Sequence, residues 1–270
     1  MSQEVYHIPA LLERTIDALD VKPGGVYVDA TYGGGGHSRA IVERLDAAGH
    51  LYGFDQDADA VARAMQDPRF TMVYGNFRFL SNFLRFYGVD GVDGILADLG
   101  VSFHHFDDAE RGFSFRADAR LDMRMNRNGR LTASEVVNEY SEERLAELMK
   151  IYGELPQARR IASAIASARA KAPVTTINAL LEAVEPTLDP RRKKKELACV
   201  FQALRIEVNG ELDALEQFLE QTVKVLKPGG RLAIITYHSL EDRLVKNFMR
   251  AGNFSGKVET DIFGRADVPL

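Results

Sequence analysis

The sequence is poor in the residues from which metal sites and disulfides are built. It contains one cysteine, Cys199, which has no partner in the chain for a disulfide bond. No Cys/His cluster has the spacing of a zinc site, and no run of 18 apolar residues is present. Residues 1–10 lack the basic and then apolar pattern of a secretory signal. These absences predict a cytoplasmic protein that does not enter a membrane and has no metal at its active site.

The charge of the chain is divided unevenly. The 270 residues carry a net charge of −5, and 46% hydrophobic with 27% charged residues is the composition of an ordinary globular protein. Residues 111–210 hold 18 Lys/Arg and 13 Asp/Glu, whereas the rest hold 16 and 26. A basic middle in an acidic body fits a polyanion bound on one face, although solvated surfaces often have an imbalance of this size.

Short apolar runs alternate with helical patterns over the first hundred residues. Such alternation predicts βαβ units and a doubly wound parallel sheet. The expected strands are 26–30, 50–55, 70–74 and 94–98, and the expected helices between them are 38–45, 57–65 and 77–87.

The pattern changes after Gly100. Residues 101–131 are irregular and rich in arginine, and helices follow at 141–152, 156–171, 176–184, 194–208 and 212–226. A buried strand returns only at 231–237, after the turn at 227–230 (KPGG). The sequence therefore predicts one α/β domain, formed by residues 1–110 and 211–270, that is interrupted by an all-helical insertion at 111–210.

Four glycines, at 33–36, end the first expected strand and open the first helix. Glycines there let the backbone turn sharply and approach a ligand, and a helix N-terminus favours a carboxylate or phosphate. A dinucleotide fingerprint requires a third glycine where this chain has Ser38, which weakens a nicotinamide site without excluding it.

Asp55 closes the second expected strand, where an acid can bind both ribose hydroxyls of an adenosine. A strand-end Asp can equally cap the next helix, but the glycine loop upstream favours the ligand role. Phe77, just past the third strand, could flank an adenine ring, although a phenylalanine in this place is more often part of the core. The KPGG turn between a helix and a strand is typical of class I methyltransferases and is also a general helix stop.

Six ordered motifs give the sequence a specific resemblance. They are 37–39 (HSR), 98–102 (DLGVS), 110–115 (ERGFSF), 121–125 (LDMRM), 201–209 (FQALRIEVN) and 238–243 (HSLEDR). Together they resemble the ribosomal RNA small subunit methyltransferase H family, from His7 to about Arg250. The resemblance implies a class I, Rossmann-like methyltransferase sheet with a helical substrate domain inserted after the fourth strand.

The resemblance also implies an activity, a cofactor and partners. The implied reaction is methylation of N4 of a cytidine in the decoding region of 16S ribosomal RNA, with S-adenosyl-L-methionine as the methyl donor. The RNA is expected within a small ribosomal subunit or its precursor, and a homodimer is left open. By resemblance, the cofactor contacts fall on Gly35, Gly36, His37, Asp55, Phe77, Asp98 and His105.

Two features depart from the family pattern. The family has a glutamine near the place of His105, so the role of His105 depends on an imidazole replacing an amide. Family members also continue into an Asn-Pro-Arg-Ala-Arg-Ser-like tail with a closing strand, which this sequence does not contain.

Asp98 and His238 are the candidate catalytic residues. An exocyclic cytosine amine is a poor nucleophile, because its lone pair is delocalised into the ring, and it needs a hydrogen-bond acceptor on its N–H. Asp98 ends the fourth strand, where open α/β sheets bind ligands, and its carboxylate or a following backbone carbonyl could be that acceptor. His238 is expected to end the fifth strand and point into the same crevice. Alternatively, Asp98 caps a turn or touches only the cofactor, and His238 is structural.

Residues 239–242 fit a capping box and are assigned to helix initiation. Gln202, Arg205 and Asn209 share one helical face, for which a polar network bracing the domain interface is preferred to a substrate contact. The candidate RNA-binding residues are Arg191, Arg192, Lys193, Lys194 and Lys195, with Arg111, Arg116 and Arg124 from the arginine series.

Two other functions remain open at this point. One is a nicotinamide-dependent dehydrogenase on the same fold. The other is a non-catalytic RNA-binding module in ribosome assembly, because an intact cofactor loop does not prove turnover.

Overall fold

The computed structural model describes residues 9–101, 109–260 and 268. The chain divides into two compact units, one formed by residues 1–100 and 212–270 and the other by residues 101–211. The boundaries expected from the sequence were 111 and 210. The second unit starts earlier, because the short 3-10 helix η2 (Ala109–Arg111) already belongs to it. Among the described residues, no helix is long and apolar enough to span a membrane.

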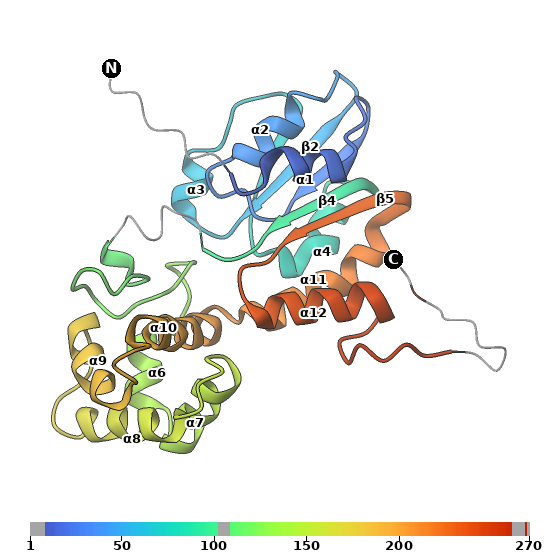
Figure 1. Ribbon diagram of the computed structural model, residues 1–270. Helices are drawn as coiled ribbons and strands as arrows, with labels where there is room; N and C mark the ends of the chain where they lie inside the picture. The colour runs from blue at the N-terminus through green and yellow to red at the C-terminus, as the bar shows by residue number, and fades with distance from the viewer. Residues whose placement is uncertain (1–8, 102–108, 261–267, 269–270) are drawn as a thin grey trace. The chain divides into compact units, whose positions relative to one another are not determined.

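The first unit contains a parallel sheet of five strands in the order β3-β2-β1-β4-β5 (Figure 1). The strands are β1 (Val26–Asp29), β2 (His50–Asp55), β3 (Phe70–Tyr74), β4 (Val92–Asp98) and β5 (Leu226–Ile235). The helices are α1 (Leu12–Leu19), α2 (Gly36–Val42), α3 (Ala58–Ala62), α4 (Leu80–Phe86), α11 (Glu211–Val225) and α12 (Ser239–Ala251), with the 3-10 turn η1 (Phe77–Phe79) before α4. The expected α/β fold class is confirmed.

Helices cover both faces of this sheet. Tyr27 of β1 and Leu96 of β4 pack with α1 and α2, whereas the next residues, Val28 and Ala97, pack in the cluster of α4, α11 and α12. Successive side chains of a strand point to opposite faces, so these strands are buried on both sides. This explains why they appear in the sequence as continuous apolar runs.

The KPGG segment forms an irregularity within β5. Val92 pairs with Leu226, but Gly94 pairs with Arg231, so the residues between Leu226 and Arg231 bulge from the ladder. Gly229 has a φ of 79°, which favours glycine. After the bulge, the paired stretch ends at Asp98 and Ile235.

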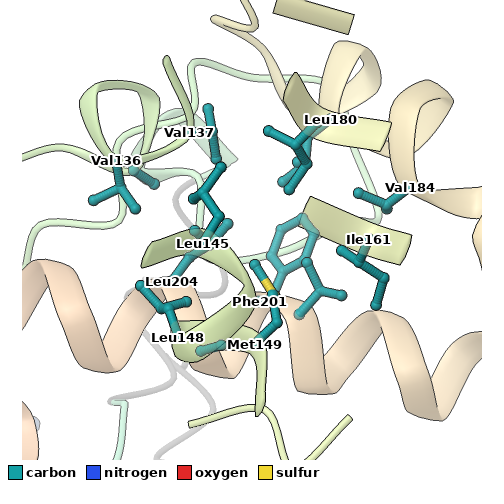
Figure 2. Packing of buried hydrophobic residues seen from close by; sticks show 14 of the residues in the cluster. Val136, Val137, Leu145, Leu148, Met149, Ile161, Leu180, Val184, Phe201 and Leu204 are labelled. Carbon is teal, nitrogen blue, oxygen red and sulfur yellow. The ribbon is translucent and has the colours of Figure 1, made fainter. Parts of the chain in front are cut away.

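The second unit is helical in its described part. Its helices are α6 (Ala133–Glu139), α7 (Glu142–Ile151), α8 (Ala158–Arg169), α9 (Ile177–Val184) and α10 (Lys193–Asn209), with the 3-10 turn η3 (Glu185–Thr187) after α9. All five helices contribute residues to one common core. Figure 2 shows part of it, including Val137, Leu145, Ile161, Leu180 and Phe201. The arginine-rich segment before α6 is held to this core by an isolated bridge between Arg120 and Thr176.

Candidate functional site

The glycine loop joins β1 to α2. Gly33 and Gly35 have φ values of 52° and 73°. A Cβ atom at Gly35 would lie 2.5 Å from the hydroxyl of Tyr32, so a side chain at this position would collide with the ring. Gly34, in contrast, is exposed, and a Cβ there would meet nothing within 4 Å. The loop therefore combines a tightly packed base with an open backbone surface at the carboxyl end of β1.

Asp55 ends β2 beside this loop. Its Oδ2 accepts a hydrogen bond from the backbone N–H of Gly33 at 2.9 Å, and its Oδ1 accepts one from the N–H of Asp57 at 2.8 Å. A carboxylate oxygen can accept more than one hydrogen bond, so these two bonds do not by themselves prevent contact with ribose hydroxyls. Asp55 thus organises the loop as well as offering acceptors to a ligand.

Phe77 begins η1 just after β3 and is half-buried. Its ring makes an edge contact with Phe218 of α11, with the ring centroids 5.2 Å apart. The preceding residue, Asn76, donates from its side-chain amide to Gln56 at 2.9 Å and so ties the end of β3 to the end of β2. Phe77 is therefore partly a core residue, and its exposed part stands at the same edge of the sheet as Asp55.

A second acid, Asp29, lies beneath the loop at the end of β1. It is 1% exposed. Its Oδ2 accepts a hydrogen bond from the hydroxyl of Ser38 at 2.6 Å, and its Oδ1 accepts one from the N–H of Thr31 at 3.1 Å. Burial raises the pKa of Asp29 above that of an ordinary aspartate, although the Ser38 hydroxyl opposes the shift. The sequence interpretation gave Asp29 and Ser38 no role.

Asp98 ends β4, which lies between β1 and β5 in the sheet. Its backbone N–H donates to the hydroxyl oxygen of Thr31 at 2.7 Å, which fixes it against the glycine loop. Its side chain is 21% exposed, and its Oδ2 lies 3.7 Å from Nδ1 of His37. Nε2 of His37 lies 3.1 Å from the carbonyl oxygen of Ala10, so this nitrogen is the donor and Nδ1 faces the acid.

Asp98 has a further partner that the sequence did not indicate. The hydroxyl of Tyr237, two residues past β5, donates to Asp98 Oδ1 at 2.8 Å. Burial raises the pKa of Asp98, while the Tyr237 hydroxyl and His37 act in the opposite direction. The pKa of Tyr237 is raised by burial and by the adjacent carboxylate, so its hydroxyl stays protonated and remains the donor.

His238 does not end the fifth strand as expected. β5 stops at Ile235, and His238 is the N-cap residue of α12, with its Nδ1 accepting from the N–H of Glu241 at 3.4 Å. Its Nε2 lies 3.1 Å from Oε1 of Glu241 but without hydrogen-bond geometry. The other Glu241 oxygen accepts from the N–H of Tyr237 at 3.0 Å. The capping group is therefore His238 rather than Ser239, and helix initiation occupies its Nδ1.

Of the expected cofactor residues, Gly35, Gly36, His37, Asp55, Phe77 and Asp98 lie at or next to the carboxyl ends of neighbouring strands. Whether they bind a cofactor stays a prediction. His105 lies outside the described residues. The open surface over Gly34 fits a ligand that lies along the loop between Asp55 and Asp98, whereas His37 is only 6% exposed.

Two expected RNA-binding arginines require correction. Arg111 is 4% exposed, and its guanidinium donates to the carbonyl oxygens of Arg124 and Met125 at 3.0 and 2.8 Å. Arg124 forms a two-bond pair with Asp122 and also donates to the carbonyl of Gly129. Both arginines thus hold the irregular segment together, because it has few ladder bonds of its own.

The remaining basic candidates differ in ion pairing and in exposure. Lys193 pairs with Glu185 at 2.6 Å. Arg116, Arg191, Arg192, Lys194 and Lys195 are exposed. These exposed cations are the ones available to a polyanion.

The polar face of α10 acts within its own unit. Gln202 donates to the carbonyl of Tyr152, and Arg205 forms a two-bond pair with Glu211. Asn209 donates to the carbonyl of Met123 and accepts from the N–H of Met125. These contacts form a polar network within the helical unit, and a role at the domain interface stays a prediction.

A five-stranded parallel sheet with a glycine loop after β1, an acid after β2 and a polar end to β4 defines a Rossmann-like nucleotide-binding site of the kind found in class I methyltransferases. The chain belongs to the MraW methylase family, whose sequence profile matches residues 4–262. It is thus a methyltransferase that uses S-adenosylmethionine, as the motifs predicted.

Curated relatives agree with this membership. The ribosomal RNA small subunit methyltransferase H of Phocaeicola vulgatus is 58% identical over 269 residues, covering 100% of this chain and 88% of the relative. The protein of the same name from Bacteroides thetaiotaomicron is 56% identical over 265 residues, covering 98% and 87%. The family resemblance inferred from the six motifs is confirmed.

Proposed function

We propose that this protein methylates N4 of a cytidine in the decoding region of 16S ribosomal RNA, with S-adenosyl-L-methionine as the donor. The observation that carries the proposal is the setting of Asp98. A partly exposed carboxylate stands at the end of β4, between the glycine loop and the end of β5, with Tyr237 bonded to its Oδ1 and His37 3.7 Å from its Oδ2. The names of the curated relatives supply the class of RNA.

The residues at the edge of the sheet fit the donor. Asp55 offers carboxylate lone pairs for ribose hydroxyls, the open backbone at Gly34 accommodates the amino-acid part, and Phe77 offers an apolar surface for the adenine. Bound there, S-adenosylmethionine supplies an electrophilic methyl group on a sulfonium.

Asp98 supplies the proton acceptor in this proposal. As the N4 lone pair forms the new N–C bond and the S–C bond breaks, one N4 proton must leave. The Oδ2 atom of Asp98 accepts the N4 hydrogen bond, which localises the lone pair before attack, and then takes the proton. Tyr237 holds the other oxygen, so Oδ2 has a fixed direction.

The phosphates of the RNA are proposed to bind exposed cations of the protein. The exposed cations at 191–195 and Arg116 lie in a segment whose net charge is positive, and phosphate neutralisation is the main source of affinity for RNA. The target base must be unpaired or flipped to approach a carboxylate at the edge of a sheet. A small ribosomal subunit or its precursor is the proposed form of the substrate.

The test is mass mapping of modified nucleosides. Small ribosomal subunits from cells lacking the gene are incubated with S-adenosylmethionine and the purified protein, with Asp98→Asn protein as a control. N4-methylcytidine that maps to one decoding-region cytidine, and only with the wild-type protein, supports the proposal. Methylation at another atom or another RNA would replace the substrate assignment. No methylation would favour a non-catalytic assembly module.

A further inference from the structure

Tyr237 is an exposed aromatic residue that is held at both ends. The residue is 59% exposed, yet its hydroxyl is bonded to Asp98 Oδ1 at 2.8 Å and its backbone N–H to Glu241 Oε2 at 3.0 Å. An exposed tyrosine usually keeps rotational freedom, and single exposed aromatics need no explanation. Here the two hydrogen bonds fix the direction of the ring although little of its surface is buried.

The absence of a side chain at Gly100 leaves room for the ring of Tyr237. A Cβ atom at Gly100 would lie 3.1 Å from Cδ2 of Tyr237 and 3.6 Å from Cγ and Cε2. Gly100 also has a φ of 97°, a conformation that other residues rarely adopt. The turn after β4 therefore lets the ring lie close over the backbone that carries Asp98.

This arrangement suits a flat aromatic ligand that carries an amine. Bases stack on tyrosine rings, and a fixed ring loses little conformational entropy when it binds. A base stacked on the Tyr237 ring would stand beside the carboxylate that the hydroxyl of the same residue holds. Ring and acceptor are thus set relative to each other by one side chain.

We propose that Tyr237 is the stacking wall of the acceptor-base site and positions Asp98 for the proton, so that the protein takes an unstacked pyrimidine beside its β4 acid. The proposal rests on the proposed cytidine methylation. It adds the residue that recognises the base. In this residue the ring stacks on the base and the hydroxyl positions Asp98.

The two roles predict different defects. Tyr237→Leu removes ring and hydroxyl, whereas Tyr237→Phe and Tyr237→Trp keep an aromatic ring and lose the hydrogen bond to Asp98. Because that bond lowers the pKa of Asp98, its loss moves the acid side of the rate profile to higher pH. At alkaline pH, where the carboxylate is ionised in each protein, KM should report the loss of the ring and kcat the loss of the positioning of Asp98.

The experiment measures kcat and KM for unmodified small ribosomal subunits between pH 5.5 and 9. For Tyr237→Leu we expect kcat/KM to fall about 10-fold or more at all pH values, the size of a lost base stack. For Tyr237→Phe and Tyr237→Trp we expect KM within about 3-fold of wild type and a lower kcat at pH 9, with the acid limb displaced to higher pH.

Tyr87→Leu is the matched control. Tyr87 is an exposed tyrosine after α4 whose ring contacts Tyr52, and it precedes β4 instead of following it. Its loss should leave kcat/KM unchanged. Calorimetric affinity for S-adenosylmethionine and the melting temperature should match wild type in all Tyr237 variants.

Wild-type kinetics in Tyr237→Leu would overturn the stacking wall. A Tyr237→Phe protein whose KM is raised as far as that of Tyr237→Leu at pH 9, or whose acid limb is unmoved, would overturn the division of roles. If the wild-type protein itself fails to methylate the subunits, the proposed function fails first, and the two failures are thereby distinguished.

Discussion

The carboxylate of Asp55 accepts the backbone N–H of Gly33 at 2.9 Å and so joins the end of β2 to the glycine loop after β1. One acid therefore shapes the loop and faces the place where a ribose would bind. A substitution at Asp55 affects both, and affinity must be measured together with stability.

For Asp55→Ala we expect the affinity for S-adenosylmethionine to fall by about 1.5–3 kcal/mol, because charge-assisted hydrogen bonds to the ribose are lost. Isothermal calorimetry measures the change. Asp67→Ala is the control: Asp67 also accepts backbone and side-chain N–H groups, from Arg69, but it precedes β3 at the other end of the strand. Unchanged affinity in Asp55→Ala would remove the ribose assignment.

Asp98→Asn should reduce single-turnover methylation by roughly 10²–10⁴-fold at saturating S-adenosylmethionine, the range for a positioned proton acceptor. Rapid-quench assays on small ribosomal subunits measure this rate. A rate near wild type at saturation would mean that Asp98 only touches the cofactor.

His238→Ala is the comparison for Asp98. Because His238 caps α12, its loss should lower the free energy of unfolding by about 0.5–2 kcal/mol while turnover is retained. Chemical denaturation and the same quench assay give both values. If His238→Ala alone abolished turnover, the acceptor role would belong to His238.

Asp29→Asn should stabilise the protein at neutral pH. Burial raises the folded-state pKa of Asp29, so its contribution to stability is complete below the unfolded-state pKa and is lost as the pH rises through the folded-state pKa. Asparagine does not titrate and can still bond to Ser38 and Thr31. We expect a gain of about 1–3 kcal/mol at pH 7 that vanishes in acid, from urea unfolding at several pH values. Asp46→Asn, at an exposed aspartate, is the control and should change stability by less than about 0.5 kcal/mol. A stability gain in Asp29→Asn that does not depend on pH would contradict the burial argument.

Arg111→Ala should lower the free energy of unfolding by about 2–4 kcal/mol, because two buried carbonyl groups lose their donor. Arg116→Ala, at an exposed arginine of the same segment, should cost less than about 0.5 kcal/mol. Equal stability of the two variants would return Arg111 to the RNA-binding candidates.

Lys194→Ser/Lys195→Ser should weaken RNA binding and make the log–log salt slope shallower, by up to about 0.7–0.9 for each lost phosphate contact. Lys150→Ser/Lys171→Ser removes the same charge from exposed positions elsewhere in the helical unit and should leave the slope unchanged. Equal slopes for both double variants would mean that the 191–195 run is only a solvated surface.

Local pattern was sufficient for much of the fold. The apolar runs of β1 to β4 are buried on both faces, and this double burial makes them continuous and therefore recognisable. Helix α6 was not predicted, although Thr132 and Glu135 form a capping box that the sequence displays. Helix α1 has no such signal, since its N-cap residue, Leu11, makes no side-chain bond.

The sequence by itself determined most of the strands and helices, the glycine loop, the acids at the strand ends and the family, because these depend on neighbours in the chain. Only the tertiary structure decided that Arg111 turns inward to free carbonyls and that Tyr237 bonds to Asp98, 139 residues away. Whether two residues far apart in the sequence form a hydrogen bond depends on how the backbone brings them together in the fold. The residue types alone do not specify this. The sequence therefore located Asp98, and the fold supplied the tyrosine that holds it.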